Sequence, residues 1–130
     1  MFIEKSLIVI ALLLPWAILI ANNKFFHGKH KFFSVISSIV LVYAALLLQV
    51  HFIDARFVKE LYVFDLNGDG VFSGIEINID QEAAMAALVN DTGRALAPIT
   101  GAIFSVLYTI VFFLVAFASS LWSKYRAKRI

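Results

Sequence analysis

The chain has 130 residues, of which 62% are hydrophobic and only 15% are charged, and its mean hydropathy is +0.88. A soluble domain of this size is nearer half apolar and a quarter charged, so the composition excludes an ordinary soluble protein. It predicts a single membrane unit over residues 1–130. The sequence has no cysteine, which excludes disulfides, thiolate metal sites and a cysteine nucleophile.

The first apolar run predicts a membrane-spanning helix over about residues 3–21. Its strictly apolar part, Leu7 to Ala21, is short for a bilayer, and the residues before it supply the missing length. A cleaved signal peptide is the alternative interpretation. The run ends in a polar Asn-Asn-Lys stretch without a small-residue cleavage site, which favours the membrane span.

The second apolar run covers residues 32–53 and is long enough to cross a bilayer. Phe57, Leu61 and Phe64 continue an apolar stripe at helical spacing beyond it. We therefore expect one long helix that leaves the bilayer and leads directly into the acidic stretch that follows.

That acidic stretch, residues 65–76, has the spacing of a calcium-binding loop. Calcium is a hard cation that takes about six to eight oxygen ligands. The first, third and fifth positions of the stretch offer side-chain oxygens, the seventh a main-chain carbonyl and the ninth a hydroxyl. The last position offers a carboxylate that can bind with both oxygens. The predicted metal ligands are Asp65, Asn67, Asp69, Val71, Ser73 and Glu76.

The stretch meets the pattern D-x-[DN]-x-[DN]-G-x5-E at every fixed position, and it resembles the EF-hand family over this loop and its flanking segments. The resemblance implies a helix-loop-helix over about residues 55–90 that binds Ca²⁺, with Gly70 at the sharp turn. Residues 73–76 also match a capping box, which predicts an exiting helix from Glu76 to about Asn90. A surface turn that binds no ion is the alternative.

Two features depart from the family pattern. Phe72 occupies a position that is usually aliphatic in EF-hands, where it normally pairs with a second loop. No other segment of the chain has the acidic spacing. The hand is therefore either solitary or paired with a loop of another chain.

A third membrane span is predicted over about residues 99–122, with Pro98 in the first helical turn. Small residues recur every fourth position along it and predict a face for close helix packing in lipid. These residues are Ala97, Gly101, Ser105 and Thr109.

The charges predict how the chain lies in the membrane. Lysine and arginine are concentrated between the first two spans and after the third, whereas every acidic residue except Glu4 falls between Asp54 and Asp91. The positive-inside rule then places the residue 22–31 loop and the C-terminus in the cytoplasm. The N-terminus and the calcium loop are predicted on the extracytoplasmic side of a cell membrane or inner membrane.

Three histidines suggest other chemistry. A helical His27-x-x-His30 pair has the spacing for a transition metal or haem, but Gly28 and the neighbouring lysines favour a basic interfacial loop that touches anionic lipid headgroups. His51 near the outer end of the second span favours interhelical hydrogen bonding over a haem or proton-relay role.

Together these patterns predict an all-α integral membrane bundle of about three transmembrane helices with one extramembrane EF-hand. We expect a protein without enzymatic activity that binds Ca²⁺ and acts as a calcium sensor or a calcium-stabilised accessory or regulatory subunit. Its expected partners are the calcium ion, the lipid bilayer, and either a membrane protein or further copies of the chain, but no nucleic acid. The alternative is a small oligomeric channel or transporter that calcium gates or stabilises.

Overall fold

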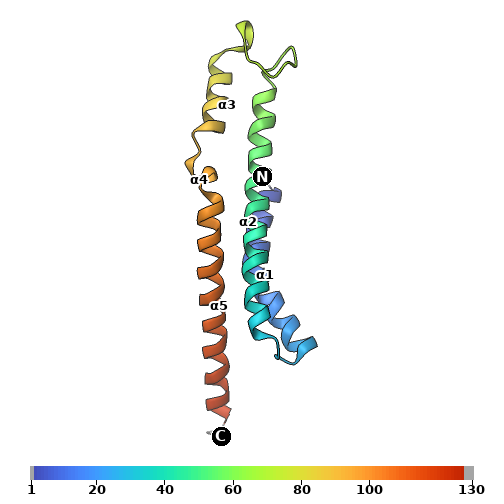
Figure 1. Cartoon of the computed structure of the whole chain (residues 1–130), viewed down its shortest axis with the longest axis vertical. Coiled ribbons are helices and arrows are strands. Elements are labelled where there is room, and N and C mark those ends of the chain that lie inside the picture. The colour runs from blue at the N-terminus through green and yellow to red at the C-terminus, as the bar shows by residue number, and fades with distance from the viewer. Residues whose placement is uncertain (1, 128–130) are drawn as a thin grey trace.

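Three long helices make up most of the chain in the computed structural model, which describes residues 2–127 (Figure 1). No strand occurs within those residues, so the all-α prediction is confirmed. In chain order the helices are α1 (Phe2–Phe26), α2 (Lys31–Tyr62), a single 3₁₀ turn η1 (Gly74–Glu76), α3 (Ile79–Val89), the short α4 (Thr92–Ala95) and α5 (Ala97–Ala127).

The long helices have the length and composition of membrane spans. The stretches Ser6–Phe26, Lys31–Tyr62 and Ile79–Ala127 each contain a window of mean hydropathy between 2.0 and 2.4, which indicates association with a membrane. The 32 residues of α2 extend about 48 Å at 1.5 Å per residue, which is more than the hydrocarbon thickness of a bilayer. The prediction of one continuous helix from the second apolar run to the acidic loop is confirmed.

α2 packs against both other long helices, with α1 and α5 beside it (Figure 1). α1 and α5 are joined by a hydrogen bond of 2.6 Å from the Tyr108 hydroxyl to the Leu12 carbonyl, and by an edge contact between the rings of Trp16 and Phe112. Pro15 lies inside α1 without ending the helix, and its side chain is fully buried.

Small polar side chains fill the contact between the long helices. Ser38 of α2 and Ser105 and Thr109 of α5 are almost completely buried. A Cβ atom added to Gly101 would lie 3.7 Å from the Tyr43 ring of α2, so the two helices approach closely there. The predicted small-residue face of the third span is therefore the face that packs on α2.

The exiting helix begins later than the sequence predicted. Residues 74–76 form only one 3₁₀ turn, and the backbone is extended at Ile77 and Asn78 before α3 starts at Ile79. The Asn78 side chain caps α3 by accepting the N–H groups of Asp80 (3.1 Å) and Gln81 (2.9 Å). The predicted capping box of Ser73 and Glu76 is present but opens only this 3₁₀ turn, so the predicted exiting helix is confirmed with a later start, at Ile79.

Candidate metal site

The acidic loop follows α2 without a flexible linker. α2 ends at Tyr62, and the N–H groups of Phe64 and Asp65 bond back to carbonyls of the last helical turn, Leu61 and Tyr62, at 3.1 and 3.3 Å. The Leu61 side chain is buried. The position of Asp65 is therefore set directly by the end of the long helix.

The first half of the loop is folded by its own acidic and amide side chains. Asp65 accepts the N–H groups of Gly68 at Oδ1 (2.8 Å) and of Gly70 at Oδ2 (2.9 Å). Asn67 Oδ1 accepts the Asp69 N–H at 2.9 Å, and its Nδ2 donates to Asp69 Oδ2 at 3.0 Å. Both glycines have positive φ, at 74° and 77°, which glycine adopts without a steric cost. The side chains of three predicted ligands thus hold one tight turn together through hydrogen bonds.

Asp69 and Val71 continue the same winding. Asp69 Oδ1 accepts the Val71 N–H at 2.7 Å, and the side chains of Val71 and Ser73 are exposed. Residues 71–73 belong to no helix or strand, and the backbone is extended at Ser73, just before η1.

Glu76 closes the loop from the other end. Its Oε1 accepts the N–H groups of Leu66 (2.9 Å) and Asn67 (3.2 Å), while its Oε2 accepts the N–H of Ser73 (3.0 Å). Only 4% of the residue is exposed, which is unusual for a glutamate in a surface loop. The last residue of the loop therefore holds its first residues in place through main-chain hydrogen bonds.

The donor set fits a hard cation such as calcium, although the carboxylates are not gathered around one point. Within residues 2–127 no group of three or more Asp, Glu or His side chains is assembled as a metal site. Each oxygen of Asp65 accepts one hydrogen bond and keeps a further lone pair for a ligand bond. The two oxygens of Glu76 accept three N–H groups, so Glu76 is the predicted ligand whose hydrogen bonds would have to change most for an ion to bind.

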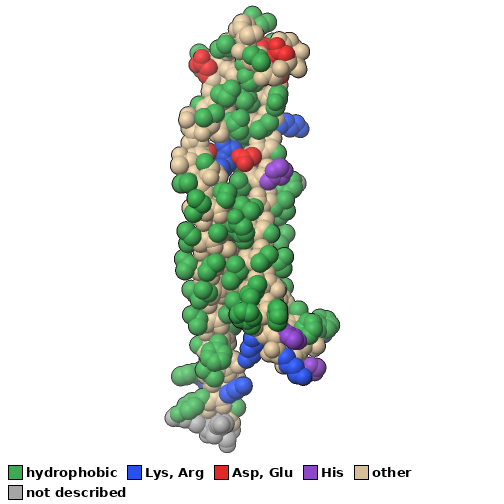
Figure 2. All heavy atoms as spheres, viewed as in Figure 1, with side chains coloured by type: hydrophobic (Ala, Val, Ile, Leu, Met, Phe, Trp, Pro, Cys, Tyr) green, Lys and Arg blue, Asp and Glu red, His purple; other side chains and the backbone are tan. Residues whose placement is uncertain are grey.

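Most of the acidic side chains lie at the loop end of the molecule, and the basic ones are concentrated at the opposite end (Figure 2). This separation keeps the lysines of the residue 22–31 loop away from Asp65, Asp69 and Glu76. The loop therefore keeps its negative charge, which favours the binding of a cation there.

Sequence reasoning missed Arg94, which fastens the far end of α3 to α2. Its side chain is only 9% exposed and donates to Asp54 Oδ1 of α2 at 2.8 Å and to Asp91 Oδ2 at 2.9 Å. It also donates to the carbonyls of Ala87 (2.8 Å) and Leu88 (2.9 Å) at the end of α3. The guanidinium lies 4.3 Å from the centre of the Phe57 ring. The sequence signal that points to part of this cluster is the Asp91-x-x-Arg94 spacing, which suits a side-chain pair in one helical turn.

Comparison with protein-family models, with curated protein sequences and with solved structures finds no match for the chain. The interpretation of the site therefore depends on its own geometry and donor chemistry.

Proposed function

We propose that this chain is a calcium-binding membrane protein whose loop at residues 65–76 binds Ca²⁺ on the extracytoplasmic side. We propose further that it acts as a calcium sensor or as a calcium-stabilised accessory subunit of another membrane protein. The observation that supports the proposal best is the continuity of the oxygen-rich loop with α2, since Asp65 follows the last turn of a helix long enough to cross the bilayer.

The side chains that would hold the ion are those of Asp65, Asn67, Asp69 and Glu76, with the Val71 carbonyl and the Ser73 hydroxyl completing the set. Bound calcium supplies a double positive charge that offsets the three carboxylates. To act as a ligand, Glu76 gives up part of its hold on the Leu66 and Asn67 N–H groups. The start of the exiting segment then shifts relative to the end of α2.

The charge distribution supports the proposed orientation. Lysines between α1 and α2 and basic residues at the end of α5 lie at the end opposite the loop (Figure 2). A cytoplasmic position for that end leaves the loop outside. Extracellular calcium modules bind with Kd of roughly 10⁻⁴–10⁻³ M, and a loop with only three carboxylates suits that range.

The channel or transporter alternative has less support from the helix interior. The buried hydroxyls of Ser38 and Ser105 donate to carbonyls of their own helices, Ser34 and Ala102. Ser38 and Ser105, whose hydroxyls are satisfied in this way, therefore favour a packing role over the lining of a water-filled path, whereas the buried Thr109 hydroxyl has no hydrogen-bond partner among the described residues.

The test is a calcium titration of the purified full chain in detergent, followed by calorimetry, for the unmodified protein and for Glu76→Gln. We expect one saturable site per chain, with affinity lowered by about tenfold or more in Glu76→Gln because a bidentate carboxylate is lost. Glu82→Gln is the matched control, since Glu82 is an exposed carboxylate on α3 outside the loop. It should bind calcium like the unmodified protein.

Two results would reject the proposal. One is the absence of saturable calcium binding at millimolar concentrations. The other is an equal loss in Glu76→Gln and Glu82→Gln, which would indicate that calcium only screens surface charge.

A further inference from the structure

The turn between α1 and α2 is built around Asn22. The Gly28 N–H bonds to the Asn22 carbonyl at 3.1 Å, and the His30 N–H bonds to Asn22 Oδ1 at 3.3 Å. His27 and Gly28 both have positive φ, at 51° and 72°, so the chain reverses over four residues. Asn22 is 2% exposed although it stands at the end of a helix beside a surface turn.

This turn carries hydrogen-bond donors without acceptors. The Asn22 Nδ2 is buried and has no hydrogen-bond partner among the described residues, which is costly for an amide. The first N–H groups of any α-helix lack intrahelical partners, and here His30 at the N-cap of α2 provides no side-chain hydrogen bond. The first turn of α2 also contains no acidic residue. Helix N-termini of this kind attract anions.

A hollow of about 350 Å³ lies at the same place. Asn22, His30 and Ser34 line its polar part, and Ile18 and Phe33 are among the residues of its apolar part. The His30 ring makes edge contacts with Phe26 and Phe33, at 5.2 and 6.2 Å between ring centres. Hydrogen-bond donors therefore lie next to an apolar wall in this hollow. A lipid needs both, because its polar headgroup is joined to an apolar acyl chain.

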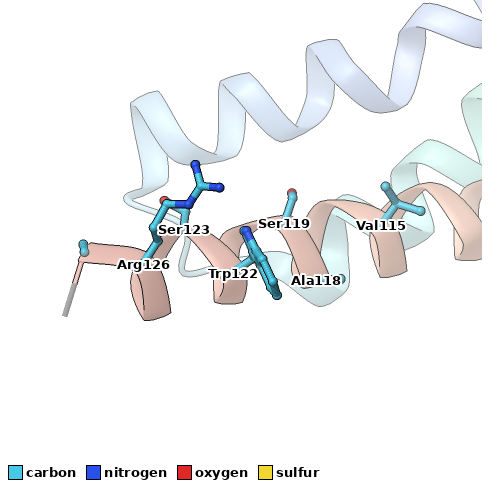
Figure 3. A pocket seen from close by; sticks show the side chains of 7 residues that line it. Val115, Ala118, Ser119, Trp122, Ser123 and Arg126 are labelled. Atoms are coloured by element: carbon cyan, nitrogen blue, oxygen red, sulfur yellow. The ribbon is translucent and has the colours of Figure 1, made fainter. Parts of the chain in front are cut away.

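The charge around the hollow is positive and has no acidic counterpart. Lys24 near the end of α1, Lys29 in the turn and Lys31 at the start of α2 are exposed, and no acidic residue occurs between positions 5 and 53 of the sequence. The end of α5 lies at the same end of the molecule, where Trp122 and Arg126 line an open hollow (Figure 3). Exposed aromatic and basic side chains together are typical of the headgroup level of a membrane.

We propose that the hollow at the α1–α2 turn is a specific binding site for the phosphate headgroup of an anionic membrane phospholipid. At the hollow, the Asn22 amide and the first main-chain N–H groups of α2 bind the headgroup, and the apolar residues hold the first part of an acyl chain. Lys29 and Lys31 do not line the hollow and attract the headgroup from the exposed surface of the turn beside it. This site is independent of the calcium loop, which lies at the opposite end of α2.

A phospholipid fits these features better than a free phosphate ion. The apolar wall offers nothing to an inorganic anion but shields an acyl chain from water. The hollow also lies at the end of α1 and α2, helices long enough to cross a bilayer, where lipid headgroups are concentrated.

Native mass spectrometry of the full chain in neutral detergent tests the site. The protein is titrated with phosphatidylglycerol and, separately, with phosphatidylcholine of the same acyl chains. We expect one phosphatidylglycerol molecule to bind saturably and at least about fivefold more tightly than phosphatidylcholine, because each lysine near an anionic headgroup contributes about that factor. A millimolar excess of inorganic phosphate should leave this binding unchanged.

Matched variants show whether the site is specific. Asn22→Asp keeps an acceptor for the His30 N–H but replaces the Nδ2 donor by a negative charge, and Asn23→Asp places the same charge on the exposed neighbouring residue. Lys29→Gln with Lys31→Gln is compared with Lys59→Gln at the loop end of α2. Binding of phosphatidylglycerol should be lost in Asn22→Asp and in the Lys29/Lys31 variant, and largely kept in the two controls.

Several results would overturn the proposal. Equal affinity for the two lipids would mean that the headgroup charge is not recognised. An equal loss in Asn22→Asp and Asn23→Asp would mean that only the general charge matters. Displacement by inorganic phosphate would identify a soluble anion as the ligand. Circular dichroism would reveal whether Asn22→Asp folds. If it does not, the exposed Lys29/Lys31 variant decides whether the site binds the anionic headgroup.

Discussion

Replacement of Arg94 by glutamine should loosen α3 without disturbing the membrane helices. The side chain is 9% exposed and bonds to Asp54 at 2.8 Å, and hydrogen bonds between charged groups contribute about 1.5–3 kcal/mol each. Asp54 is 48% exposed, so solvent screening places this pair at the low end of the range. The stacking on Phe57 adds about 1 kcal/mol. We expect a loss of about 2–3 kcal/mol in the local stability of α3 and α4.

Amide hydrogen exchange followed by mass spectrometry measures this local stability. A loss of 2–3 kcal/mol corresponds to exchange about 30- to 150-fold faster in residues 79–95, because each 1.4 kcal/mol is a factor of ten. The buried part of α5, around Thr109, should exchange as in the unmodified protein.

Arg56→Gln is the control for Arg94→Gln. Arg56 pairs with Glu60 at 3.6 Å one helical turn away and lies 5.3 Å from the centre of the Phe57 ring, but its side chain is 41% exposed, so its removal should change exchange only about fivefold. If Arg94→Gln changes the exchange of residues 79–95 no more than Arg56→Gln does, the argument that Arg94 fastens α3 to α2 is refuted.

Two further predictions concern helix packing and orientation. Gly101→Ala should leave the thermal unfolding temperature in detergent nearly unchanged, since the added Cβ would make ordinary contacts at 3.7–3.9 Å. Gly101→Leu should lower the free energy of unfolding by about 1–3 kcal/mol, because the larger side chain forces α5 away from Tyr43 and Leu46. Similar unfolding temperatures for both variants would show that α2 and α5 do not pack closely there. Because the chain has no cysteine, single Glu82→Cys and Ser123→Cys variants can report the orientation through a membrane-impermeant maleimide applied to intact cells. Glu82→Cys should react from outside and Ser123→Cys only after permeabilisation, and the reverse pattern would contradict the extracytoplasmic position of the loop.

The membrane helices could be predicted from the sequence because their signal is local. Long apolar runs identify spans by length and hydropathy alone, and the stripe from Phe57 to Phe64 correctly extended the second span into the acidic loop. The small residues at intervals of four correctly identified the packing face of α5, since close packing in lipid needs small side chains.

The start of α3 could not be predicted because two helix-start signals overlap. Ser73 with Glu76 and Asn78 with Gln81 both have the spacing of a capping box. The choice depends on the partners of the Glu76 carboxylate, which accepts N–H groups from Leu66 and Asn67, ten and nine residues earlier. The Arg94–Asp54 contact spans 40 residues and depends on the length of α3, so no local pattern in the sequence reveals it.

The contacts of Glu76 and Arg94 would determine how calcium bound at the proposed site affects the helices. Glu76 controls the start of the exiting segment, whereas Arg94 holds the end of α3 to Asp54 on the same helix that enters the loop. α3 therefore lies between two contacts with the α2 side of the hairpin, one made by Glu76 and one made by Arg94. In this arrangement calcium would mainly stabilise the hairpin between α2 and α5. A sensor, in contrast, needs a second state with a different affinity for the ion, and the Arg94 cluster is the contact whose opening would provide it.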